Sequence, residues 1–154
     1  MKIAVGADHA GVPLNETVIA ELKRLGHEVV DFGTHDASKP DDYPDYAEAV
    51  GRAVLDGRAE RGVLVCGSGV GVSVAANKLP GIRAGLCHDC YSAHQGVEHD
   101  NMNVLCMGSL VIGPELALDL VRLFLGAQFT GEPRHVRRLA KIAAMEHENL
   151  QGMK

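Results

Sequence analysis

Short apolar runs alternate along the chain with longer amphipathic runs, and this alternation predicts its secondary structure. Five short runs rich in apolar and β-branched residues are expected to be strands, at residues 2–7, 27–33, 62–66, 82–87 and 103–107. Each is followed by residues with helical periodicity, at 13–25, 43–55, 70–78, 89–98 and 114–125. The repeated strand–helix order predicts a parallel sheet that is covered by helices on both faces.

The last amphipathic segment, residues 133–150, has no strand of its own and no vacant sheet face to cover. It begins with a basic cluster and carries an apolar stripe formed by Val136, Leu139, Ile142 and Ala143. Because a helix is stabilised mainly by burying such a stripe, we infer that this one packs on a second subunit. The chain is therefore expected to form a homo-oligomer.

Length and charge narrow the class of protein. A chain of 154 residues without an internal repeat or linker suits a single domain over residues 1–154. Its net charge of −5 offers no basic surface for nucleic acid or for a membrane. No apolar run reaches the roughly 18 residues of a membrane span, and strand-like sequence stands where a signal peptide would be. We expect a cytoplasmic protein with neither nucleic acid nor membrane as a partner.

The four cysteines, Cys66, Cys87, Cys90 and Cys106, are expected to be reduced thiols in that compartment. Cys87 and Cys90 have the C-x-x-C spacing of redox dithiols, so a redox role stays open, although the usual neighbouring Trp or Pro is lacking. A Cys/His zinc site would need four ligands, and a second C-x-x-C is missing. No metal is expected.

The most distinctive segment is VLVCGSGVGVS at residues 63–73. A strand-like run ends at Cys66 and passes through Gly67, Gly69 and Gly71 into a helix. Glycines let the backbone approach an anion, and a helix N-terminus supplies amide donors, so the turn predicts a phosphate site. Its spacing matches neither the dinucleotide fingerprint nor the Walker A loop. Cys66, at a strand end, is either a core thiol or a thiolate acting as nucleophile or base.

Other polar residues join this turn as candidates. Asp8 and His9 follow the first strand, at the edge of the sheet expected for Cys66. They are either a helix cap and a satisfied imidazole, or ligands for a hydroxyl and an anion. His99, in a polar loop before the fifth strand, is either solvated or brought to the site by a neighbouring subunit. The polar loop 37–42 is a candidate rim or lid.

Arg134 and Arg138 are four residues apart on the last predicted helix, so they share one of its faces. Arginine suits a phosphate group because its guanidinium forms paired, charge-assisted hydrogen bonds. The alternative is a solvated basic turn.

Five segments together resemble the ribose-5-phosphate isomerase B family, within the wider RpiB/LacA/LacB sugar-phosphate isomerases. They are GADHAG at 6–11, DYPDYA at 42–47, CGSGVGVSVAANKLPGIRA at 66–84, HDNMNVLCMGS at 99–109 and RHVRRL at 134–139. The resemblance implies a Rossmann-like three-layer α/β/α domain with no metal or other cofactor. It also implies a dimer, or a dimer of dimers, in which two subunits build each site.

The same resemblance implies roles for individual residues. Cys66 is the base that moves a proton between C2 and C1 of a phosphorylated sugar, and Ser68 helps to polarise the reacting oxygens. His99 opens the furanose ring, and Asp8 holds a sugar hydroxyl. The substrate-binding positions are Gly67, Gly69, Val70 and Gly71 around the enediolate, Tyr43 near the sugar, Asp100 where a substrate amide contact is usual, and His9, Arg134 and Arg138 at the phosphate.

Two positions depart from the family pattern. Asp100 stands where Asn is usual, and Leu110 stands where a phosphate-binding Arg is usual. The first hypothesis is an aldose–ketose isomerase that interconverts D-ribose 5-phosphate and D-ribulose 5-phosphate. The alternatives are an isomerase of the same mechanism on another tetrose, pentose or hexose phosphate, and a non-catalytic sugar-phosphate-binding protein.

Overall fold

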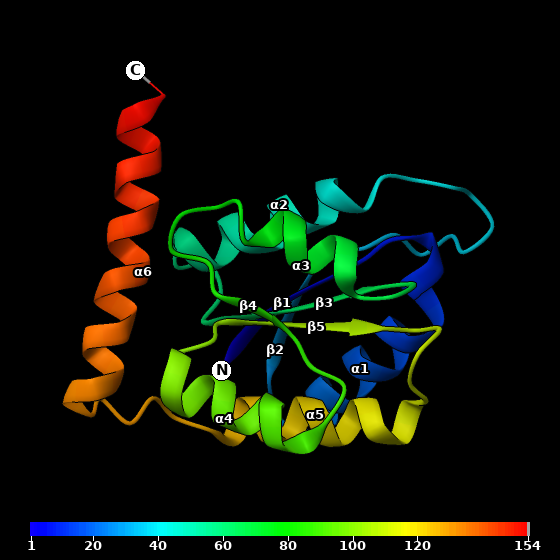
Figure 1. The fold of residues 1–154 in the computed structure, drawn as a ribbon. Helices are drawn as coiled ribbons and strands as arrows, with labels where there is room; N and C mark the ends of the chain where they lie inside the picture. Colours follow the sequence, from blue (N-terminus) through cyan, green and yellow to red (C-terminus); the bar gives the residue numbers. More distant parts are fainter. Residues whose placement is uncertain (154) are drawn as a thin grey trace.

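The computed structural model describes residues 1–153 and has a parallel sheet at its centre, with helices on both faces (Figure 1). The strands are β1 (Lys2–Ala7), β2 (Glu28–Asp31), β3 (Arg61–Cys66), β4 (Ala84–Leu86) and β5 (Val104–Gly108), in the spatial order β2-β1-β3-β5-β4. The helices are the 3-10 turn η1 (His9–Gly11), α1 (Val12–Arg24), α2 (Tyr43–Leu55), α3 (Val70–Ala76), α4 (Cys90–Asp100), α5 (Pro114–Gly126) and α6 (Pro133–Gly152).

Helices lie on both sides of the sheet (Figure 1), and two layers of apolar side chains hold them against it. On one face α1, α4 and α5 bury side chains such as Leu22, Val97 and Phe124. On the other face α2 and α3 bury Val50 and Val72. The central strands are covered from both sides, which explains why they are apolar at nearly every position. The predicted Rossmann-like three-layer α/β/α fold is confirmed.

Some boundaries differ from the sequence prediction. The run at 82–87 forms only the three-residue strand β4, which lies at the edge of the sheet and pairs with β5 alone. The expectation that His99 lies in a loop is wrong, because α4 continues through His99 and Asp100. Asn101 then ends the helix in the left-handed conformation, with φ of 48°, which Asn adopts more readily than most residues.

Helix α6 stands beside the sheet, at the edge where the strands begin, and covers neither face (Figure 1). Its main neighbour is α4, and the Glu146 carboxylate accepts a hydrogen bond of 3.2 Å from the Gly81 backbone N–H. Apolar side chains along the helix remain exposed, namely Val136, Ile142, Met145 and Leu150. That the helix packs on a second subunit stays a prediction. Among the described residues no helix has both the length and the apolar character to span a membrane.

Candidate active site

The thiol of Cys66 lies at the carboxyl end of β3, where the chain turns into α3. The residue is 4% exposed, and the Gly69 backbone N–H donates a hydrogen bond of 3.1 Å to its Sγ. Gly69 has a φ of 78°, and a Cβ at this position would lie 2.8 Å from the carbonyl carbon of Met107. Only glycine can therefore turn this amide back onto the sulfur, where it stabilises negative charge.

Ser68 and Tyr43 border the same turn. The Ser68 hydroxyl is exposed and accepts a hydrogen bond of 3.2 Å from the Val70 N–H, at the start of α3. Tyr43 begins α2, and its ring packs so closely on Gly71 that a Cβ there would lie 2.8 Å from the ring. The structure thus brings together Cys66, Ser68, Tyr43 and the glycine turn that the sequence singled out.

Asp8 and His9 directly follow β1 and lie, like Cys66, at the carboxyl ends of the strands. Asp8 is buried, and its Oδ1 accepts a hydrogen bond of 3.0 Å from the Gly11 N–H, so it caps η1. His9 is partly exposed, and its Nδ1 lies 2.7 Å from Oδ1 of Asp41, in the loop before α2. The cap engages only one of the two Asp8 oxygens.

Sequence reasoning missed Asp41 and Tyr46. The Tyr46 hydroxyl donates a hydrogen bond of 2.7 Å to Oδ2 of Asp41, and the His9 backbone N–H donates one of 3.0 Å to Oδ1. Burial alone would raise the pKa of Asp41, but these bonds and the His9 imidazole lower it below its ordinary value. Asp41 follows His9 by 32 positions, so no local pattern signalled the pair.

The ligand atoms of Asp8, His9 and Asp41 all lie within 4.8 Å of one another, close enough to face a common ion. Three of the four carboxylate oxygens, however, already accept hydrogen bonds from the protein. We therefore describe the group as a hydrogen-bonded network.

His88 is a second residue at this edge that sequence reasoning did not select. Its Nε2 accepts a hydrogen bond of 2.9 Å from the backbone N–H of Gly108, which is the register partner of Cys66. An accepting Nε2 carries no proton, so the ring proton is on Nδ1. The nearby Cys87 is buried, and burial followed by the charge of Asp89 raises its pKa to about 11. A thiol with so high a pKa stays protonated near neutral pH and is a poor nucleophile. This argues against a redox role for the C-x-x-C pair.

The remaining candidates form a second cluster, between the end of α4 and the start of α6. The imidazoles of His99 and His135 stack there, with ring centroids 4.1 Å apart. Nε of Arg134 lies 3.2 Å from Nε2 of His135, to which it donates, while Nδ1 of His135 lies 2.7 Å from the Thr130 hydroxyl. Asp100 and Arg138 flank this cluster and are exposed.

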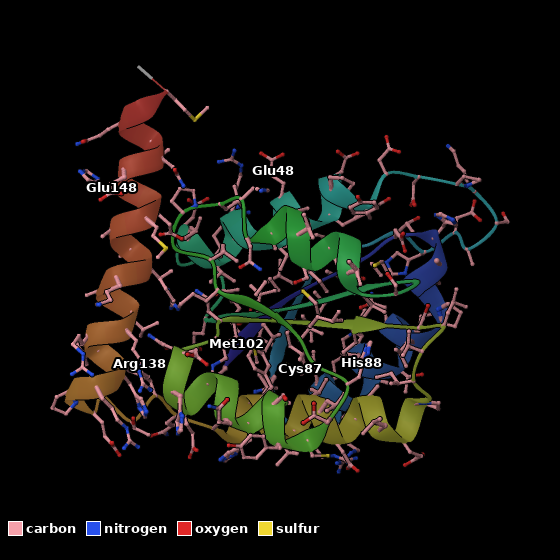
Figure 2. The ribbon with its side chains drawn as sticks, in the orientation of Figure 1. Glu48, Cys87, His88, Met102, Arg138 and Glu148 are labelled. Atoms are coloured by element: carbon pink, nitrogen blue, oxygen red, sulfur yellow. The ribbon has the colours of Figure 1, made fainter. Side chains whose placement is uncertain are left out.

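The two clusters lie at opposite ends of the strands. His99 and Asp100 precede the start of β5, whereas Cys66 pairs with Gly108 at its end, about 13 Å farther along the strand. In Figure 2, Arg138 on α6 and His88 near the strand ends stand on opposite sides of the view. A single chain therefore does not bring His99, Asp100, Arg134 or Arg138 to Cys66.

Comparison with known proteins gives a consistent family. The Ribose/Galactose Isomerase family model matches residues 3–142. Ribose-5-phosphate isomerase B of Escherichia coli is 48% identical over 94% of this chain and 96% of that protein. D-erythrulose-4-phosphate isomerase of Pectobacterium atrosepticum is 38% identical over 96% and 97% of the two chains. The structure of Clostridium thermocellum ribose-5-phosphate isomerase B superposes with a TM-score of 0.94 at 45% identity, covering 97% of this chain and 99% of that one. The chain therefore belongs to the ribose/galactose isomerase family, and it is a sugar-phosphate isomerase.

Proposed function

We propose that this isomerase interconverts D-ribose 5-phosphate and D-ribulose 5-phosphate, with Cys66 as the base. The observation that carries the proposal is the Cys66 sulfur at a strand end, held by the Gly69 amide beside a turn of further amides. The thiolate removes the proton from C2 of the open-chain aldose while O1 gains a proton. The resulting enediol loses its O2 proton, and the thiol returns a proton to C1, which gives the ketose.

The amides of the turn have a defined task in this reaction. Negative charge develops on O1 as the C2 proton leaves, and on O2 in the second half of the reaction. Fixed donors that face this charge stabilise the transition states more than the substrate. Gly67 and Gly71 offer such donors, and the Val70 amide holds the exposed Ser68 hydroxyl beside them. The reaction needs only a base and oriented donors.

Two further tasks, ring opening and phosphate binding, fall to the second cluster. We propose that His99, Arg134 and Arg138 of a second copy complete each site, because they lie too far from Cys66 within one chain. The exposed apolar side chains of α6 support this arrangement, since α6 also carries both arginines. In such an assembly His99 opens the furanose ring, and the arginines join His9 at the phosphate.

The test also includes a second substrate, because Leu110 and Asp100 differ from the family pattern at positions where the substrate is expected to bind. The relative from Pectobacterium atrosepticum acts on D-erythrulose 4-phosphate, a sugar one carbon shorter. Leu110 is 84% exposed beside Gly67, where the family pattern has a cationic group. A site with one cation fewer holds a phosphate dianion less tightly or at a different position.

The decisive experiment is a turnover screen followed by NMR. Ribose 5-phosphate, ribulose 5-phosphate, D-erythrulose 4-phosphate and hexose 6-phosphates are each incubated with the enzyme under the same conditions. The proposal expects the highest kcat/KM with the pentose pair. A kcat/KM at least about tenfold higher with the four-carbon or a six-carbon sugar would transfer the assignment to that substrate, because tenfold corresponds to about 1.4 kcal/mol of transition-state stabilisation.

A further inference from the structure

We infer that Asp41 is a positioning residue, which fixes the imidazole of His9 so that its Nε2 faces the substrate phosphate. The inference rests on the proposed function in taking His9 as a phosphate ligand. Its structural basis is independent of that assumption. One carboxylate oxygen of Asp41 lies 2.7 Å from Nδ1 of His9 and 3.0 Å from its backbone nitrogen. The other oxygen accepts the Tyr46 hydroxyl at 2.7 Å.

These contacts determine which ring nitrogen of His9 carries a proton. The hydrogen bonds lower the pKa of Asp41, so its carboxylate is ionised and can only accept. Nδ1 of His9 must therefore be the donor. Nε2 is then the nitrogen left to meet a ligand, and a phosphate oxygen needs a donor there as well. When a phosphate oxygen binds there, both ring nitrogens donate, one to Asp41 and one to the phosphate.

The same contacts hold the ring in one orientation. Tyr46 belongs to α2, so its hydroxyl ties the loop carboxylate to a rigid helix. With both oxygens engaged, Asp41 cannot rotate away without breaking a hydrogen bond. Its side chain is 19% exposed and that of His9 is 34% exposed, so the pair is partly shielded yet open to a ligand. Carboxylate partners act in this way on ligand-binding histidines elsewhere in proteins.

Asp36, in the same loop, provides a matched control. Its carboxylate accepts hydrogen bonds from the backbone N–H and hydroxyl of Ser38, and it has only this local role in the loop. A loss of loop order alone would therefore follow from substitutions at either aspartate. A loss of His9 positioning would follow from those at Asp41 only.

The test uses the full-length enzyme with 15N-labelled histidine and two substitutions, D41A and D41N. In the native protein we expect the His9 nitrogen shifts of an Nδ1–H imidazole. In D41A these shifts move toward those of free imidazole. The KM for ribose 5-phosphate and the inhibition constant of inorganic phosphate rise about tenfold or more, while kcat changes far less. D41N keeps an acceptor oxygen but loses the charge, so its effects are intermediate. D36A leaves the His9 shifts, the KM, the inhibition constant and kcat unchanged.

Unchanged His9 nitrogen shifts in a folded D41A or D41N would overturn the inference, as would equal effects of D36A and D41A. The NMR measurement needs no substrate, so it separates this inference from the proposed function. If ribose 5-phosphate is not turned over but the His9 shifts change as expected, the positioning role stands and the substrate assignment fails. If D41A does not fold, the D41N shifts and phosphate inhibition decide.

Discussion

The imidazole of His99 lies against that of His135, with ring centroids 4.1 Å apart and planes inclined by 27°. His135 is 1% exposed and accepts a hydrogen bond from Arg134. It therefore joins the residue proposed to open the sugar ring to one proposed to bind the phosphate. Because a buried imidazole that accepts from a guanidinium is neutral, it also places an uncharged surface beside His99.

The pH dependence of stability tests the state of His135. Burial lowers its pKa below 6.5, and the nearby charges of His99 and Arg134 lower it further. In the unfolded chain His135 binds a proton near its ordinary pKa, whereas the folded protein resists protonation. Its contribution is therefore fully present above about pH 6.5 and is lost as the pH falls through that value.

We expect the Tm of the native protein to fall more steeply between pH 7 and pH 5 than that of H135Q. The other seven histidines are common to both proteins, so the difference between the two slopes reports His135. Parallel slopes would mean that His135 is not held neutral. Thermal unfolding in a series of buffers at one ionic strength provides the measurement.

Composite sites predict that two inactive variants restore each other. C66A loses the proposed base, and H99N loses the proposed ring-opening group, so each alone is expected to be nearly inactive. If a site takes Cys66 from one copy and His99 from another, a mixed dimer contains one intact site out of two. Random reassociation of equal amounts should then recover about a quarter of the native activity. Failure to recover any activity, with subunit exchange verified by mass spectrometry, would contradict shared sites.

The exposed side of α6 predicts the surface through which copies associate. Ile142 and Met145 are 42% and 62% exposed, and a charge at either position would be costly to bury in an interface. We expect the double variant I142E/M145E to shift toward monomer in light scattering and to lose most of its activity. K141E places the same charge at a neighbouring exposed position and serves as the control. An active, native-sized I142E/M145E oligomer would exclude this surface.

Leu110 predicts a weakness in phosphate binding. A charge-assisted hydrogen bond contributes roughly 1.5–3 kcal/mol, so L110R should lower the KM for ribose 5-phosphate about tenfold. Adding D100N should lower it further, because this removes a negative charge from the second cluster. An unchanged KM in both variants, with efficient turnover of another sugar phosphate by the native enzyme, would indicate a site built for that other ligand.

The sequence predicted one edge of the site well, because strand ends and glycine turns have local signatures. Cys66, Gly69 and Asp8 each follow an apolar strand run, and parallel strands bring their carboxyl ends together. In the second cluster, helical spacing singled out Arg134 and Arg138, but only the family resemblance assigned them with His99 to the same site as Cys66. The extension of α4 through His99 depends on Asn101, which ends the helix two residues later than predicted.

Contacts distant in sequence left no local signal. The pairing of His9 with Asp41 joins a strand end to an irregular loop. The stacking of His99 on His135 joins two helices through residues that are 36 positions apart in the sequence. The strand order is a further case, since the place of β5 between β3 and β4 follows from packing across the whole sheet.

The central claim, proton transfer by Cys66, is tested most directly with ribose 5-phosphate deuterated at C2. The native enzyme should release the label to water or transfer it to C1 during isomerisation. C66A should fold normally and slow both isomerisation and loss of the C2 label by about 10³-fold or more, whereas C90A, at an exposed cysteine, should match the native enzyme. Label loss from C2 at a near-native rate in C66A would contradict the account.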